Sequence, residues 1–160
     1  MNLNKRSWKP YLCWILLTEA VGGLAALLTQ ESTKLYGTTI RKPPLSPPAA
    51  VFPVVWTILY ALMGVSAARI RRLPPSAERT AALRLFLIQL TVNFVWSILF
   101  FNLEAFGLSF FWLILLFALI VRMILVFRDL DEPAAWLQIP YLLWVFFAGY
   151  LNYGVWMLNR

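Results

Sequence analysis

The chain has 160 residues, of which 61% are hydrophobic and only 13% charged, a composition too apolar for a water-soluble domain of this size. Its net charge of +7 comes from basic residues in short segments between long apolar runs, where they orient a membrane protein, so nucleic acid is not an expected partner. A single cysteine, Cys13, excludes an intrachain disulfide, and the lack of histidine removes the usual zinc and haem-iron ligand. We therefore expect an integral membrane protein whose partner is the lipid bilayer, with no metal site and no required cofactor.

Five apolar segments are long enough to cross a bilayer as helices, since about 20 residues span its ~30 Å hydrocarbon core. Lipid offers no partners for backbone groups, so each segment must close its own hydrogen bonds. The predicted helices run over about 11–29, 49–68, 83–101, 106–127 and 134–157. The sequence thus predicts an all-α fold, a bundle of five transmembrane helices that forms a single domain over residues 1–160.

The first segment follows basic residues, as the apolar core of a secretory signal does. Its length, its acidic residue Glu19 and the four further spans favour a retained helix instead. Glu19 lies deep inside the predicted span, which makes it a candidate for ligand or proton chemistry. The alternative is a neutral, hydrogen-bonded carboxyl group without a function of its own.

Basic residues are distributed unequally between the two ends of the predicted bundle. With the N-terminus in the cytoplasm, nine of them lie on that side: Lys5, Arg6, Lys9, Arg69, Arg71, Arg72, Arg79, Arg84 and Arg128. Four lie on the other side: Lys34, Arg41, Lys42 and Arg160. This bias predicts a cytoplasmic N-terminus and an outside C-terminus, and together with the absence of a cleavable signal it favours a bacterial cytoplasmic membrane.

The connection from Gln30 to Pro48 is the long one on the outer side. Four of the six residues from Pro43 to Pro48 are prolines, which cannot continue a helix and stiffen the chain before the second span. We expect this loop to cap the bundle from outside. In the last span, Pro140 is expected to bend the helix.

Three spans carry aromatic and polar side chains at helical spacing, so that each set shares one helix face. The sets are Trp56, Tyr60 and Gly64 on helix two, Gln89, Asn93, Trp96 and Phe100 on helix three, and Trp144, Ala148, Asn152 and Trp156 on helix five. Amides facing lipid would cost several kcal/mol, so these faces are expected to point inward. They form either ordinary helix packing or one pocket for a large planar apolar ligand.

The same residues carry a resemblance to a known family. They include Tyr36, the run Lys42-Pro43-Pro44-Leu45-Ser46-Pro47-Pro48, Val51-Phe52-Pro53, Trp56, Tyr60, Gln89, Asn93, Trp96, Phe100-Phe101, Pro140-Tyr141, Trp144, Ala148 and Leu151-Asn152. In this order and spacing the chain resembles the TspO/MBR family, the tryptophan-rich sensory proteins and translocator proteins once called peripheral benzodiazepine receptors. The matching residues cover all but the first helix and the connectors.

The resemblance implies a five-helix fold, often a homodimer, that binds porphyrins and related tetrapyrroles in a pocket beneath the first long loop. The ligand-binding candidates are Tyr36, Trp56, Tyr60, Asn93, Trp96, Trp144 and Ala148. The chain departs from the family pattern at two places. Leu45 stands where the family usually has tryptophan, which puts ring stacking by this loop in doubt. The six residues between Tyr153 and Arg160 exceed the spacing of the sterol motif, so sterol binding is not expected.

The leading interpretation is a sensory or regulatory protein that binds a porphyrin, either protoporphyrin or a haem-like ring. Trp56 and Trp144 would stack on the ring, with Asn93 and Tyr60 orienting its polar edges. Propionates would reach either the lipid headgroups or the long loop, where Lys42 or Arg41 favours a carboxylate.

Two further functions remain open. One is an enzyme that degrades porphyrin in light, with Trp56 and Trp144 as electron donors and no ordinary nucleophile–base pair. The other is a transporter of porphyrin-like ligands, which the lack of an evident inverted repeat makes less favoured.

Overall fold

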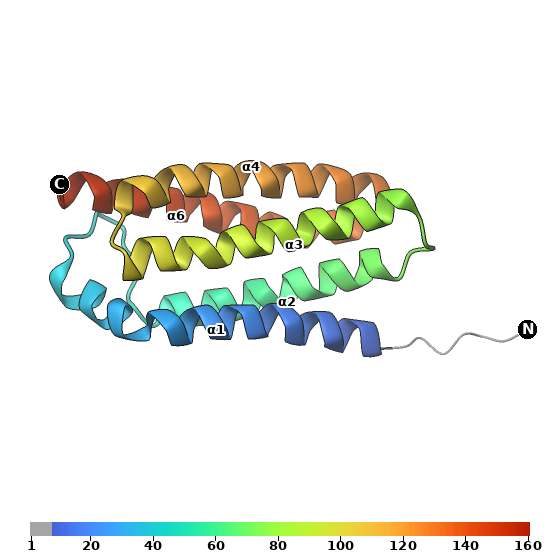
Figure 1. Cartoon of the computed structure of the whole chain (residues 1–160), viewed down its shortest axis with the longest axis horizontal. Helices are drawn as coiled ribbons and strands as arrows, with labels where there is room; N and C mark the ends of the chain where they lie inside the picture. The colour runs from blue at the N-terminus through green and yellow to red at the C-terminus, as the bar shows by residue number, and fades with distance from the viewer. Residues whose placement is uncertain (1–7) are drawn as a thin grey trace, which may run out of the picture.

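The computed structural model describes residues 8–160, and in it long helices lie side by side along one axis (Figure 1). They are α1 (Lys9–Thr39), α2 (Val51–Arg71), α3 (Ala77–Ser97) with the π-helical turn η1 (Ile98–Asn102), α4 (Phe106–Leu130), the short α5 (Glu132–Trp136) and α6 (Ile139–Leu158). With η1 counted as part of α3 and α5 as part of α6, five helices within residues 8–160 are long and apolar enough to cross a membrane. The predicted all-α class with five transmembrane helices is confirmed.

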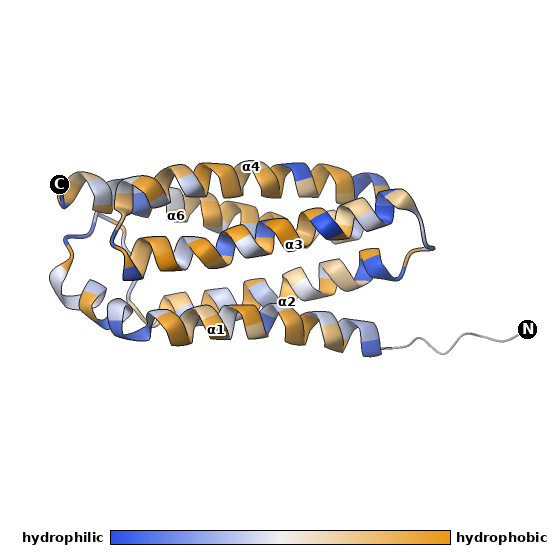
Figure 2. Ribbon diagram, viewed as in Figure 1, coloured by the Kyte–Doolittle hydropathy of each residue, from blue (hydrophilic) through white to orange (hydrophobic). Residues whose placement is uncertain are grey.

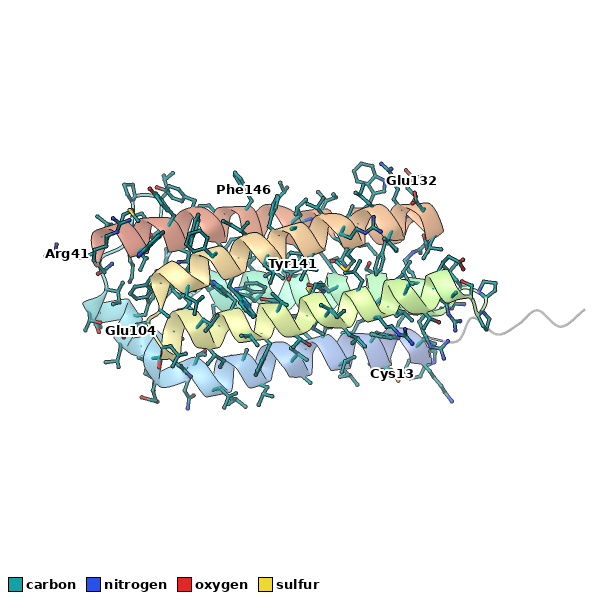
Figure 3. The ribbon with its side chains drawn as sticks, turned by 45° about the horizontal axis from the view of Figure 1, so that its top comes forward. Cys13, Arg41, Glu104, Glu132, Tyr141 and Phe146 are labelled. Carbon is teal, nitrogen blue, oxygen red and sulfur yellow. The ribbon has the colours of Figure 1, made fainter. Side chains whose placement is uncertain are left out.

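The long helices are hydrophobic along most of their length (Figure 2), and many of their large apolar side chains are exposed on the outside of the bundle. Leu27, Ile58, Leu143 and Phe146 each expose more than half of their surface, and Figure 3 shows Phe146 pointing outward from α6. Such a surface suits hydrocarbon and would be unfavourable in water. The chain is a multi-pass membrane protein.

The helices form a ring in the order α1, α2, α6, α4, α3. The closest packing is between α1 and α2, followed by α4 with α6 and α3 with α4, whereas α2 and α6 touch only sparsely. Fully buried side chains such as Phe86, Ile120 and Phe127 fill the interior toward one end. The other end is hollow and holds the candidate site.

Helix α1 is longer than the apolar segment 11–29 and continues to Thr39 through residues predicted to form a loop. Its polar turns satisfy their own groups: the Thr33 hydroxyl donates to the Thr29 carbonyl at 2.8 Å, and Lys34 pairs with Glu31 at 2.7 Å. These last turns bend over the end of the bundle in Figure 1. The hydropathy of the sequence indicates where the hydrocarbon core of the membrane ends. The helix continues beyond that point because its polar side chains find partners within the helix.

The last span is divided rather than bent. A turn at residues 137–138 separates α5 from α6, and Pro140 lies in the first turn of α6. The expected bend of a continuous helix at Pro140 was wrong. In the first turn of a helix the backbone N–H groups have no partner within the helix, so a proline there removes no hydrogen bond and does not bend the helix.

Side-chain contacts fasten α2 to the last span at one end of the bundle. At the end where α2 stops, the Ser66 hydroxyl donates to the Ala134 carbonyl at 2.7 Å, and Arg69 pairs with Asp131 at 3.0 Å. Figure 3 places Glu132 at this end and Arg41 at the other. The start of α1 and the C-terminal end of α6 lie at opposite ends of the bundle, as an odd number of spans requires (Figure 1). Lys5 and Arg6, part of the predicted charge bias, lie outside the described residues.

Candidate ligand-binding site

A cavity of about 380 Å³ lies under the loop that joins α1 to α2, a volume within the range of small-molecule pockets. Side chains from α1, α2, α3, η1, α6 and the loop line it. Its aromatic lining consists of Tyr36, Phe52, Trp56, Tyr60, Trp96, Phe100, Phe101 and Trp144. The cavity is therefore walled largely by flat rings.

One wall comes from α2, where the four-residue spacing of Phe52, Trp56 and Tyr60 brings them to the same face. The Trp56 and Tyr60 rings lie 5.5 Å apart with a tilt of 31°, and Tyr141 contacts Trp56 edge-on at 6.3 Å. Phe52 meets Trp144 of α6 edge-on at 5.9 Å. These contacts hold the rings in defined orientations before any ligand binds.

The opposite wall is built around η1. Trp96 stacks on Phe100 at 5.3 Å, and Tyr36 from the end of α1 packs against Phe100 and Phe101 at 5.4 and 5.5 Å. Consecutive residues Phe100 and Phe101 both line the cavity, within a turn wider than an α-helix. Such π-helical turns are frequent at functional sites.

Asn152 is the polar anchor of the cavity. Its side-chain oxygen accepts from the Trp96 indole N–H at 3.1 Å and from the Ser109 hydroxyl at 3.0 Å, while its amide group donates to the Phe106 carbonyl at 2.8 Å. Three of its hydrogen-bonding positions are thereby used. Asn152 fixes the Trp96 ring against α4 and α6 and has little capacity left for a ligand.

Among the described residues that line the cavity, Lys42 is the one that carries a charge. Its ammonium group donates to the Gly37 carbonyl at 2.9 Å and lies 5.1 Å from the centre of the Tyr36 ring. This holds a positive charge at the outer rim of the cavity. A ligand with an apolar body and an anionic edge matches that distribution.

The structure brings six of the predicted residues together: Tyr36, Trp56, Tyr60, Trp96, Trp144 and Ala148 all line the cavity. Asn93 does not. It lies behind Tyr60, and its amide group donates to the Tyr60 hydroxyl at 3.4 Å, so its contribution would be to position that ring.

Three other residues singled out in the sequence lie away from the lining. Glu19 is half-buried on α1. Arg41 is held by Asn159, to which its backbone N–H donates at 3.0 Å. Leu45 is 81% exposed with a backbone φ of 66°, so the position where the family usually has tryptophan points away from the cavity.

The part of the lining that was missed is the face of α1. Gly22, Ala25, Ala26, Thr29, Gln30 and Thr33 all border the cavity. A Cβ atom at Gly22 would overlap the Tyr60 ring, so this glycine makes room for the aromatic wall. The signal was present in the sequence as small and hydroxyl residues recurring every three or four positions along the first helix.

The chain is similar to known proteins over most of its length. The family model described as TspO/MBR family matches residues 14–157. The tryptophan-rich protein TspO of Chlorobaculum tepidum is 37% identical over 158 residues, which cover 98% of this chain and 99% of that protein. The translocator protein of Bos taurus is 32% identical over 155 residues, or 96% and 92% of the two chains. Protein CrtK of Rhodobacter capsulatus is 35% identical over 122 residues, 76% of each chain. The chain belongs to the TspO/MBR family.

Proposed function

We propose that this protein binds a porphyrin or a related planar tetrapyrrole in the cavity and serves as a sensory or regulatory protein of the membrane. The observation that carries the proposal is the cavity itself, a space of about 380 Å³ walled by aromatic rings inside a membrane bundle. A relative from Cereibacter sphaeroides, 30% identical, is named a tryptophan-rich sensory protein, which supports the sensory role.

In the proposed complex, indole rings from two helices contact the ligand. Trp56 on α2 and Trp144 on α6 both line the cavity, and each aromatic pair contributes about 0.5–1.5 kcal/mol beyond the burial of apolar area. Lys42 at the rim would pair with a propionate. The part proposed for Asn93 is indirect, through its hydrogen bond to Tyr60.

The direct test is equilibrium binding of protoporphyrin to the purified protein in nanodiscs, followed by the absorbance of the porphyrin. Ala148→Leu fills the cavity from α6 and is expected to weaken binding by about 5- to 150-fold, as an overpacking cost of about 1–3 kcal/mol would do. Ala20→Leu, on the exposed face of α1, is the matched control and should bind as the unaltered protein does. Equal, non-saturable uptake by all three proteins would show that the porphyrin merely partitions into the lipid.

A second candidate is light-dependent porphyrin degradation, favoured by the presence of both Trp56 and Trp144 in the lining. A photoexcited ring in contact with an indole is placed to receive an electron from it. The Trp56→Phe, Trp144→Phe double variant keeps apolar rings at both positions. Light-dependent product formation that disappears in this variant while binding remains would assign this activity, whereas equal turnover would exclude the two indoles as donors.

The proposal includes a homodimer, in keeping with the family resemblance. Cross-linking in native membranes should give a species of twice the chain mass at low protein density. A chain that stays monomeric at every density would contradict this part and leave the binding proposal unaffected.

A further inference from the structure

A second hollow lies on the outside of the bundle, in the seam between α2 and α6. It is an open groove of about 370 Å³ lined by Val55, Ile58, Leu59, Pro140, Leu143, Trp144 and Phe147. Ile58 and Leu143 on its two walls expose 55% and 63% of their surface. All of its lining is apolar, so in a bilayer the groove faces acyl chains.

Trp144 belongs to both spaces. It lines the inner cavity and the outer groove, and its ring is half-buried. Its neighbours are other rings, with Phe52 at 5.9 Å and Phe147 at 5.7 Å. The Trp144 indole therefore lies between the cavity and the lipid-facing groove.

Side-chain hydrogen bonds fasten the seam near the end of α2. There the Ser66 hydroxyl binds the Ala134 carbonyl of α5 at 2.7 Å, and Arg69 binds Asp131, just before α5, at 3.0 Å. At the level of the cavity, α2 and α6 face each other through apolar side chains and pack only sparsely. Opening the seam there requires rotation of side chains and breaks no backbone hydrogen bond, since those are closed within each helix.

The loop over the outer end of the cavity is, in contrast, fastened to α6 and to the residue that follows it. Arg41 and Asn159 exchange two hydrogen bonds at 3.0 and 2.9 Å, and the Tyr150 hydroxyl donates to the Pro44 carbonyl at 2.8 Å. The Pro43 ring packs so closely on Gly154 that a Cβ there would lie 2.5 Å from it. These contacts hold the loop in place beside the outer rim of the cavity.

We propose that the seam between α2 and α6 is a lateral passage between the bilayer core and the cavity, with Trp144 as its gate. The inference rests on the proposed function, because it describes the route of that ligand. A planar apolar molecule dissolved in the membrane reaches the groove without crossing water. Rotation of the Trp144 indole then joins the groove to the cavity.

The experiment measures association and dissociation rates of protoporphyrin with the protein in nanodiscs, followed by porphyrin absorbance so that an added indole does not enter the signal. Ile58→Trp and Leu143→Trp each fill the groove from outside the cavity. Leu115→Trp, on the lipid-facing side of α4, is the matched control. Both groove variants should slow association and dissociation together by about tenfold with unchanged affinity, since a blocked passage raises the barrier in both directions.

A fourth variant separates the two routes. The Tyr150→Phe, Asn159→Ala double variant releases the loop from α6 and should leave both rates unchanged. Groove variants with unaltered rates, or a released loop that accelerates binding, would overturn the lateral passage while the cavity remains a binding site. Weaker affinity at an unchanged association rate would overturn it as well, since the groove would then be part of the binding site. Absence of saturable binding in the unaltered protein would overturn both proposals.

Discussion

At the scale of single residues, neighbouring positions on α1 have opposite surroundings. A Cβ at Gly22 would overlap the Tyr60 ring of the cavity wall, whereas a Cβ at Gly23 meets nothing within 4 Å. Both glycines lie in a helix, where glycine is less favourable than alanine by about 1 kcal/mol. The sequence gives no reason to distinguish the two glycines. Their contacts show that the packing of Tyr60 against α1 requires a glycine at position 22 and not at position 23.

We expect Gly22→Ala to lower the free energy of unfolding by about 1–3 kcal/mol, because the added Cβ would displace the Tyr60 ring from its contacts with Trp56 and Asn93. Gly23→Ala should be neutral or stabilising by up to about 1 kcal/mol. Denaturant unfolding in detergent followed by circular dichroism measures both. The same loss of stability in the two variants would refute the assigned role of Gly22.

A second residue-scale prediction concerns Asn152. Asn152→Leu keeps the approximate volume but leaves the buried Trp96 N–H without its acceptor, at a cost of about 1–3 kcal/mol, whereas the Ser109 hydroxyl can still donate to the Phe106 carbonyl at 3.0 Å. Asn102→Leu, which removes one exposed hydrogen bond to the Leu28 carbonyl, should cost less than about 1 kcal/mol. Thermal unfolding distinguishes them, and equal losses would count against the anchoring role.

At the scale of the elements, the approach of α1 to α2 depends on Gly64. A Cβ there would lie 2.6 Å from the backbone Cα of Ile15, and the neighbouring Thr18 hydroxyl already donates across the interface to the Tyr60 carbonyl at 2.8 Å. Close approach through a small residue is the usual means of helix association in lipid, where no hydrophobic force drives helices together. The position of the α1 face of the cavity follows from this contact.

Gly64→Ala is therefore expected to push α1 away from α2, because backbone atoms cannot yield as the end of a flexible side chain does. We expect a loss of about 1–3 kcal/mol in unfolding free energy together with weaker porphyrin binding, since α1 forms one wall of the cavity. Gly149→Ala on α6, where a Cβ meets nothing within 4 Å, is the control. Intact binding and stability in Gly64→Ala would show that the helix pair tolerates wider spacing.

At the scale of the whole molecule, the charge bias predicts that the loop over the cavity faces outward and that the connector before α3 faces the cytoplasm. In a Cys13→Ser background, Leu45→Cys should react with a membrane-impermeant maleimide applied to intact cells, since Leu45 is 81% exposed. Ala77→Cys, exposed at the other end, should react only after the cells are opened. The reverse pattern of labelling would invert the predicted topology.

Composition and periodicity determined the all-α class, the five spans and the inward direction of the aromatic faces, because a bilayer leaves a chain few ways to satisfy its backbone and amides. Together with the resemblance, they also named most of the residues that line the cavity. Only the tertiary structure decided that α1 continues to Thr39 and supplies a wall, that Asn93 lies behind Tyr60, and that Trp144 borders both the cavity and the lipid-facing groove. Spacing along one helix assigns a residue to a face, whereas its neighbours depend on how closely another helix approaches, and that distance is set by contacts between residues far apart in the chain.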